Sequence, residues 1–204
     1  MTLLFSHYTR ELRRMDENPT RFATQRFAAT VLPIDSQGRE ILLNAYAYRG
    51  ASENEELLVL VHRNEKLVDG TIPLVGVHLS CVTGDVFRSR RCNCYEQLQV
   101  ALKTLCATEF GALVYLPHNH VNSLDLVKKL RSYSSQDHGD DAVGATVASS
   151  TQIGARSYAL IANALFQLGM HTIQLLPNSP AKAEALSALG LSVTASADPM
   201  NASA

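Results

Sequence analysis

The sequence predicts one α+β domain in which a mixed or antiparallel sheet is flanked by helices. Two observations lead to this prediction: strand-like segments separated by tight turns fill the first half, and helices alternate with two short strands in the second half. The 204 residues are 46% hydrophobic and 18% charged, so a single domain has enough apolar side chains for a sizeable core.

The first half carries a charged segment and then four predicted strands. Residues 1–26 are rich in charge and show only weak helical periodicity, so we expect an N-terminal arm or helix. The uncharged run from Leu57 to Val61 is typical of a buried strand, and the segment from Asp35 to Gly38 indicates a turn. We predict strands at residues 27–33, 41–48, 57–61 and 72–79.

The second half is predicted to be mainly helical. Loop 134–154 is rich in Ser, Gly and Asp, and a loop of this length in a compact domain is usually functional or mobile. We expect a frayed end from Thr194, with the main domain at 27–195 and a flexible tail at 196–204. Hydrophobic spacing predicts helices at 94–106, 124–133, 155–168 and 181–189, and strands at 112–116 and 173–176.

Three of the four cysteines lie between the fourth predicted strand and the first helix. Cys81, Cys92 and Cys94 form a C-x10-C-x-C pattern. Thiolates are favoured zinc ligands, and three protein ligands leave a fourth position for water, which is typical of a catalytic zinc site. The residues alone leave two alternatives open: a disulfide between two of the three, or buried thiols that act as small apolar side chains. Cys106 fits a core position on the helix.

Charge and hydropathy argue against two classes of partner. The formal net charge is −1, so there is no global electrostatic case for binding a nucleic acid. The chain has no apolar run of transmembrane length and no charged-then-apolar leader, so we expect no membrane partner. We therefore expect a cytoplasmic protein whose thiols are reduced.

The cysteine pattern belongs to a longer run of motifs. Cys81-Val-Thr-Gly-Asp-Val-Phe is followed by Ser89, Arg91, Cys92, Cys94 and Glu96-Gln97-Leu98. Further along come Arg131-Ser-Tyr133, Gln136-Asp137-His138-Gly139 and Leu175-Leu176-Pro-Asn178-Ser-Pro180 with Lys182. In content and order these motifs resemble the GTP cyclohydrolase II family, and the resemblance extends over about residues 55–195.

The resemblance implies the family's fold and an enzyme, a hydrolase that acts on cyclic amidine C–N bonds. Members of the family open the imidazole ring of GTP with zinc-activated water, release formate and pyrophosphate, and feed riboflavin synthesis. The resemblance implies that Cys81, Cys92 and Cys94 hold Zn2+, which lowers the pKa of its water toward about 7. Mg2+ is a second candidate cofactor for a polyphosphate substrate, and a homodimer is the assembly typical of the family.

Five further positions match functional positions of the family. The resemblance implies catalytic roles for Arg156 and Tyr133, and substrate-binding roles for Gln97, Lys182 and His78. The residue types alone allow other roles. An arginine favours a plain phosphate contact over nucleophilic attack because its pKa exceeds about 12, and a helix tyrosine often packs in the core. Gln97 and Lys182 are residue types common on exposed helix faces, although a lysine near a helix N-terminus suits a phosphate.

Several of the family's charged contacts are missing from this chain. The family's Arg-Val-His-Ser-Glu stretch is here residues 76–80, without its arginine and glutamate, and its Arg-Gln-Glu-Gly-Arg loop is replaced by residues 117–121. The family's general-base aspartate is here Gly154, and two nucleotide-contacting threonines are Pro177 and Ala142. Since charge-assisted contacts are the strong ones in polar recognition, we interpret these losses as altered substrate recognition.

Two histidines, His118 and His120, lie in the replaced loop. A histidine titrates near neutral pH, so each is a candidate for a new base in the reaction. The alternative is a polar surface loop in which both histidines are solvated.

Three functions remain open from the sequence. The first is a zinc hydrolase that opens a C–N bond of a purine nucleotide or related nitrogen heterocycle, with recognition altered from GTP. The second is a genuine GTP cyclohydrolase II. The third is a non-catalytic, zinc-stabilised protein that binds a nucleotide or a partner. Gly154 favours the third over the second, and the open three-cysteine site favours the first over the third.

Overall fold

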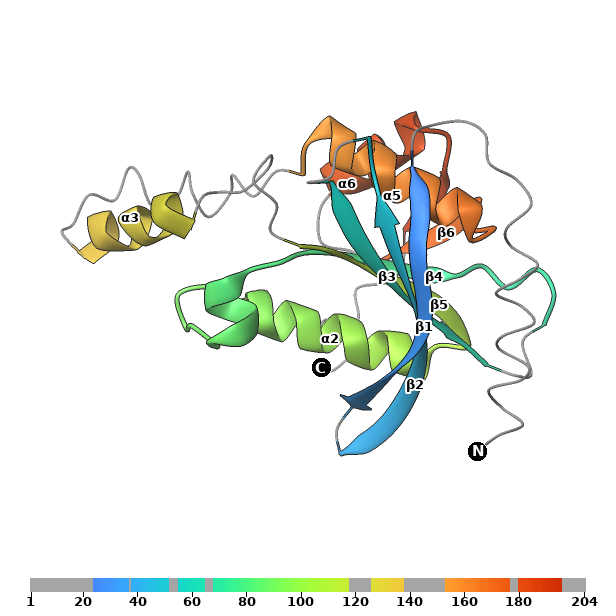
Figure 1. The fold of residues 1–204 in the computed structure, drawn as a ribbon, viewed down its shortest axis with the longest axis horizontal. Coiled ribbons are helices and arrows are strands. Elements are labelled where there is room, and N and C mark those ends of the chain that lie inside the picture. Colours follow the sequence, from blue (N-terminus) through green and yellow to red (C-terminus); the bar gives the residue numbers. More distant parts are fainter. Residues whose placement is uncertain are drawn as a thin grey trace.

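The computed structural model describes residues 24–36, 38–51, 55–64, 68–117, 126–137, 153–176 and 180–195. These residues form a seven-stranded sheet with helices on both faces (Figure 1). This architecture confirms the predicted α+β class with a mixed sheet and flanking helices. No helix within those ranges is long and apolar enough to cross a membrane.

The sheet has an antiparallel half and a parallel half. Its strands are β1 (Gln25–Ser36), β2 (Arg39–Arg49), β3 (Glu56–Arg63), β4 (Leu74–Leu79), β5 (Phe110–Leu116), β6 (Thr172–Leu175) and β7 (Ser192–Ala195). Their order across the sheet is β1-β2-β3-β5-β4-β6-β7. The pairs from β1 to β5 are antiparallel, and the pairs from β5 through β4 and β6 to β7 are parallel. Parallel neighbours need crossover connections, which the later helices provide.

The helices follow the strands in the order that the sequence predicts. They are α2 (Cys94–Ala107), α3 (Leu126–Asp137), α5 (Ala155–Gln167) and α6 (Pro180–Ala188), and a π-helical turn, η1, spans Val82–Val86. The predicted helices and strands agree with the observed bounds to within a few residues. Hydrophobic periodicity was therefore a sound guide to these elements.

Two short elements, η1 and β7, were not predicted. Thr194 pairs with Gln174, and Ala195 pairs with Leu175, so the expectation of a frayed end from Thr194 was wrong. Because β7 has only four residues, its alternation is too short to distinguish from a polar tail. The π-helical turn is a single turn with no hydrophobic period of its own.

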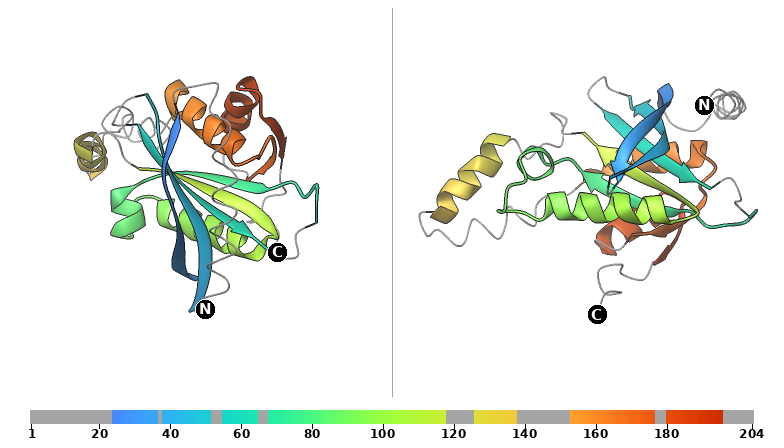
Figure 2. Two further views of the ribbon diagram at one scale, coloured as in Figure 1. Left: turned by 45° about the vertical axis from the view of Figure 1, so that its right-hand side comes forward. Right: turned by 90° about the horizontal axis from the view of Figure 1, so that it is seen from below.

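Apolar side chains cover both faces of the sheet. Val59 of β3 packs in a cluster with Ile161 of α5 and Leu186 of α6. The next residue, Leu60, points to the opposite face and packs in a second cluster with Leu105 of α2. Successive side chains of a strand point to opposite faces, which explains the division. Figures 1 and 2 show α2 on one side of the sheet and α5 and α6 on the other.

The parallel half of the sheet positions the cysteine loop. β4 ends at Leu79, which is in register with Leu116 at the end of its parallel neighbour β5. Cys81 and η1 follow directly after β4, and α2 begins at Cys94. In parallel sheets, ligands bind beyond the carboxyl ends of the strands. The loop that carries the three cysteines therefore lies at the edge where a ligand site is expected.

Leu43 and Leu42 are adjacent in β2 but face opposite ways, so they form a matched pair for testing the core. Leu43 is 0% exposed and Leu42 is 41% exposed. We expect Leu43→Ala to lower the free energy of unfolding by about 2–5 kcal/mol, because it removes buried methyl groups and leaves a cavity. Leu42→Ala is expected to cost about 1 kcal/mol or less. Urea denaturation measures both losses, and equal losses would contradict the register of β2.

Candidate metal centre

The cysteine loop is held in shape by its own backbone. Cys81 caps η1: its Sγ accepts a hydrogen bond from the Gly84 N–H at 3.2 Å, and its carbonyl accepts one from the Asp85 N–H at 2.6 Å. Arg88 has a φ of 54°, a left-handed conformation that residues other than glycine rarely adopt. Cys94 is the first residue of α2. A capped turn, a strained residue and a helix start therefore fix this loop.

The structure brings the three predicted ligands together. The Sγ atoms of Cys81, Cys92 and Cys94 all lie within 4.8 Å of one another, and those of Cys81 and Cys92 are 3.8 Å apart. A tetrahedral ion with metal–sulfur bonds of about 2.3 Å holds its sulfur ligands about 3.8 Å apart. All three residues are free cysteines, so the disulfide alternative is wrong. The thiols are spaced to hold one metal ion.

Gly84 makes room for the three thiols. A Cβ atom at this position would lie 2.8 Å from the Cys94 Cβ, 2.9 Å from the Cys92 Sγ and 3.2 Å from the Cys81 Sγ. Two of these separations are shorter than Cβ atoms tolerate, so a larger residue would push the thiols apart. The glycine of the Thr-Gly-Asp stretch is thus a requirement of the cysteine cluster.

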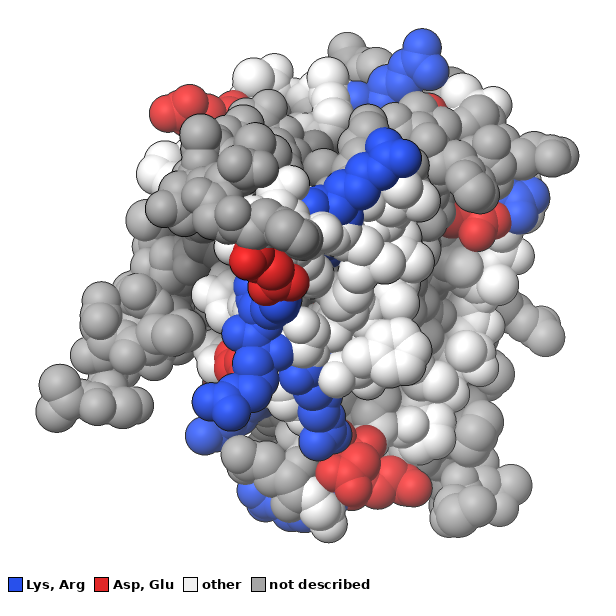
Figure 3. Space-filling model, turned by 90° about the vertical axis from the view of Figure 1, so that its left-hand side faces the viewer, with Lys and Arg blue, Asp and Glu red and all other residues white. Residues whose placement is uncertain are grey.

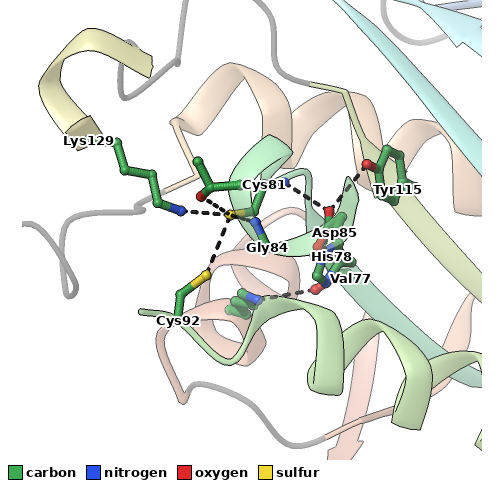
Figure 4. Close-up of polar contacts among 10 residues, drawn as sticks. Val77, His78, Cys81, Gly84, Asp85, Cys92, Tyr115 and Lys129 are labelled. Carbon is green, nitrogen blue, oxygen red and sulfur yellow. Dashed lines mark hydrogen bonds and ion pairs between the residues drawn. The ribbon is translucent and has the colours of Figure 1, made fainter. Parts of the chain in front are cut away.

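A lysine from α3 faces the first thiol. Lys129 Nζ donates a hydrogen bond to the Cys81 Sγ at 2.6 Å (Figure 4). Burial alone would raise the pKa of the Cys81 thiol, but hydrogen bonds from Lys129, Thr83 and the Gly84 N–H lower it to about 7. Burial and the neighbouring thiols raise the pKa of Cys94. A thiolate is therefore favoured at Cys81 near neutral pH, and the thiolate is the form that binds metals.

The buried carboxylate of Asp85 joins the loop to the sheet. Its side chain is 5% exposed and accepts hydrogen bonds from the Cys81 N–H at 2.8 Å and the Tyr115 hydroxyl at 3.3 Å. His78 Nε2 lies 3.1 Å and 3.0 Å from the two carboxylate oxygens. Burial and the Asp85 carboxylate raise the pKa of Tyr115 to about 12, so its hydroxyl stays protonated. As Figure 4 shows, Asp85 connects β4, β5 and the cysteine loop at one point.

Arg91, which precedes the second cysteine, fastens α3 to the loop. Its guanidinium donates to the Tyr133 carbonyl at 3.0 Å and to the Asp137 carboxylate at 2.6 Å, and its Cζ lies 5.2 Å from the centre of the Tyr133 ring. The Tyr133 hydroxyl is buried and has no hydrogen-bond partner in the described part of the chain. Because an unpaired buried hydroxyl costs free energy, Tyr133 is suited to bond with a group that enters the site.

His78 and Lys182, two predicted substrate contacts, lie beneath the cysteine loop. His78 is 7% exposed, and its ring stacks on the Tyr115 ring with 5.7 Å between centroids. Lys182 of α6 donates a hydrogen bond to the Val77 carbonyl at 3.2 Å, and burial lowers its pKa to about 8. Both side chains are therefore fixed against β4 at the end of the strand that leads into the loop.

Gln97 and Arg156, the other predicted site residues, lie on the surface. Gln97 is exposed on α2, in the turn after Cys94. The Arg156 side chain is 81% exposed, and its Nη1 lies 3.8 Å from a Glu55 carboxylate oxygen. Gly154 is the N-cap of α5 and brings no side chain to this helix start. The candidate bases His118 and His120 lie outside the described residues.

Three residues of the site were not identified from the sequence: Asp85, Lys129 and Tyr115. For Asp85 a signal existed: it is the only acidic or basic residue, histidine apart, between Gly70 and Phe87. A lone charge in an apolar stretch is usually buried with partners. Lys129 and Tyr115 gave no such signal. A lysine on a helix is usually exposed to solvent, and a tyrosine on a strand often packs in a core, so neither residue indicates a site.

The face of the molecule that carries the cysteine loop is basic. Figure 3 shows Lys and Arg side chains along this face, with fewer Asp and Glu side chains, most of which adjoin a Lys or an Arg. Arg91 is 42% exposed at this surface, beside the second cysteine. The chain as a whole has a net charge of −1, but Lys and Arg outnumber Asp and Glu on this face.

Comparisons with known proteins agree with this arrangement. A sequence profile of the GTP cyclohydrolase II family matches residues 26–198. The monofunctional riboflavin biosynthesis protein RIBA 3 of Arabidopsis thaliana, a chloroplastic protein, is 38% identical over 152 residues, which cover 74% of this chain and 30% of that protein. The riboflavin biosynthesis protein RibBA of Salinispora tropica is 38% identical over 147 residues, which cover 72% of this chain and 36% of the relative.

A cyclohydrolase-like α+β domain with a thiol cluster is thus the class that the fold and the site define. The chain belongs to the GTP cyclohydrolase II family, whose members are hydrolases acting on a C–N bond of a purine, and the predicted family is confirmed. The chain spans about a third of the length of the curated relatives it matches.

Gly84→Ala tests the cysteine cluster without removing a thiol. We expect this variant to lose most of its affinity for Zn2+, because the added Cβ displaces the Cys92 and Cys94 side chains. Val82→Ala is the control, since Val82 belongs to the same turn and is 39% exposed. Competition with a chromophoric chelator measures the affinity, and circular dichroism checks the fold. Unchanged affinity in folded Gly84→Ala would contradict the assigned cluster.

Lys182→Met is expected to raise stability at pH 7 by on the order of 2 kcal/mol. Lys182 titrates at about 8 in the folded protein, below its ordinary value, so the unfolded chain binds more protons between those two values. As the pH rises through this window, the free energy of unfolding of the wild type therefore increases relative to that of Lys182→Met. The two proteins should be about equally stable by about pH 11.

Urea denaturation of wild type and Lys182→Met at pH 7 and at high pH measures this difference. Lys103→Met is the matched control, because Lys103 is exposed on α2. A stability gain of the same size at both pH values would show that Lys182 is not held at a lowered pKa.

Proposed function

We propose that this chain is a zinc-dependent hydrolase that opens a C–N bond of a purine nucleotide or a related nitrogen heterocycle. The observation that carries the proposal is the spacing of the Cys81, Cys92 and Cys94 sulfurs on one loop beyond the parallel strands. Three thiolates suit Zn2+, and a set of three leaves one coordination position open. When bound, Zn2+ supplies Lewis-acid activation of water at neutral pH.

The residues around the thiols have separate parts in this proposal. Asp85 holds the Cys81 backbone and the His78 ring, so we assign His78 to positioning the loop, since it is 7% exposed. Tyr133 offers its buried hydroxyl, which has no partner among the described residues, to charge that develops on the substrate. The Arg156 Nη1 lies 3.8 Å from the Glu55 carboxylate, which is a long separation for an ion pair, and the Arg156 side chain is 81% exposed, so its guanidinium can reach a phosphate.

Two further residues are assigned to binding the nucleotide. Lys182 has a pKa of about 8, so it is mostly charged at neutral pH and attracts an anion. Gln97 presents its amide on the exposed face of α2, in the turn after Cys94. His118 and His120 are the candidate bases in the proposal.

GTP is the first substrate to test, because the similar proteins are named for riboflavin biosynthesis. A second candidate is a heterocycle recognised differently from GTP. It is favoured by Gly154, which leaves the start of α5 without the carboxylate that the family uses as a base. A non-catalytic role in nucleotide binding is the outcome if no heterocycle is opened.

The assembly and cellular setting are also part of the proposal. The family resemblance supports a homodimer, and a polyphosphate substrate would use Mg2+ to neutralise its charge. A cytoplasmic location agrees with four free cysteines. Sedimentation of the purified protein measures the assembly, and a sedimenting monomer would overturn the dimer.

Formate release from GTP in the presence of Zn2+ and Mg2+ tests the proposed chemistry. We expect formate from the wild type and none above background from Cys92→Ser, because the metal loses one of its three ligands. Cys106→Ser is the matched control: Cys106 lies on α2, is half-buried and is not part of the sulfur cluster. Equal formate release by wild type and Cys92→Ser would contradict a metal-dependent reaction.

Gly154→Asp decides between GTP and an altered substrate. A positioned general base contributes about 10²–10⁴-fold to a rate, so restoring a carboxylate should raise GTP turnover by about a hundredfold if its absence limits the reaction. Gly154→Asn is the control, because it caps the helix equally well without providing a base. Rapid GTP turnover by the wild type, with no gain in Gly154→Asp, would overturn the altered-substrate candidate.

A further inference from the structure

The charge of the cysteine cluster is a problem for its proposed chemistry. Three thiolates and one divalent cation carry a net charge of −1. Thiolates also donate electron density to the metal, and this donation reduces its power to polarise a bound group. A hydrogen bond to a thiolate withdraws part of that density, and partners of this kind tune metal sites in general.

Lys129 is in the place where such a partner is needed. Its Nζ lies 2.6 Å from the Cys81 Sγ, and the ammonium group approaches from α3 rather than from the cysteine loop (Figure 4). In the described part of the chain, no carboxylate is paired with Lys129. Among the described residues, the Cys81 thiol is therefore the hydrogen-bond acceptor of the Lys129 ammonium group.

We propose that Lys129 is a positioning residue that stays hydrogen-bonded to the Cys81 thiolate when the metal is bound, and offsets the negative charge of the three sulfurs. This proposal rests on the proposed function and adds a residue to it. Lys129 touches neither substrate nor metal. It acts through Cys81, by making that sulfur a weaker electron donor and so keeping the metal a stronger Lewis acid.

The attachment of α3 does not depend on this lysine. Arg91 links the cysteine loop to Tyr133 and Asp137 of the same helix. Removing the Lys129 ammonium therefore leaves two hydrogen bonds that hold α3 against the loop. A variant at Lys129 tests the hydrogen bond to sulfur more than it tests the docking of the helix.

Substitution of Co2+ for zinc gives a spectroscopic test that needs no substrate. The near-ultraviolet sulfur-to-cobalt charge-transfer band reports the energy of the sulfur electrons. A hydrogen bond lowers that energy and moves the band to shorter wavelength. We expect Lys129→Met to move the band to longer wavelength, and Lys129→Arg, which keeps a charged donor, to stay close to the wild type. Lys103→Met on α2 is the matched control and should leave the band unchanged.

The outcomes separate this proposal from the function on which it rests. A band in Lys129→Met that coincides with the wild-type band overturns the role of Lys129. If Lys129→Met does not retain cobalt, Lys129→Gln replaces it in the test. Gln is at most a neutral, weaker donor, so its band is expected at longer wavelength than the wild-type band, and a band that coincides with the wild type overturns the role of Lys129. If the wild type itself binds no cobalt through sulfur, it is the proposed metal site that fails.

Steady-state kinetics on the substrate that the wild type turns over provide a second readout. We expect Lys129→Met to lower kcat by about 10–100-fold with little change in KM, because the residue acts on the metal and not on substrate binding. Rescue of kcat in Lys129→Arg would support the proposal. A raised KM with unchanged kcat would overturn it, since that result assigns Lys129 to the substrate.

Discussion

The buried carboxylate of Asp85 fixes the geometry on which the proposed metal centre depends. Three thiols on one loop repel one another once they ionise, so the loop needs an anchor outside itself. Asp85 provides it by accepting hydrogen bonds from the Cys81 N–H and the Tyr115 hydroxyl while it pairs with His78. A buried carboxylate is costly without such partners, and here they come from β4, β5 and the loop itself. Asp85 therefore holds the cysteine loop against the sheet, and the sheet supplies the partners that make the buried carboxylate tolerable.

The elements of the fold and the thiol cluster could be predicted because each depends on local sequence. Hydrophobic spacing revealed the helices and strands, and the C-x10-C-x-C pattern identified all three clustered cysteines. Spacing could not separate a metal site from a disulfide, because that distinction depends on sulfur positions in space. Lys129 lies 48 residues from Cys81, and only the folded chain brings the two together. β7 was missed because its stability comes from pairing with β6.

The residues proposed to bind a substrate come from other elements than the residues proposed to hold a metal. The thiols come from the loop between β4 and α2, whereas Arg156 and Lys182 come from α5 and α6. The start of α5, where Gly154 is the N-cap, lies on a different element from the sulfur cluster. Under the proposed function, this separation would let the sulfur cluster stay intact while the contacts to the substrate change.

X-ray absorption at the zinc edge of the metal-loaded protein tests the central claim most directly. The account predicts one zinc per chain, with three sulfur neighbours at about 2.3 Å and one lighter atom at about 2.0 Å. A spectrum with four sulfur neighbours would mean a closed structural site. A protein that takes up no stoichiometric zinc would contradict the account altogether.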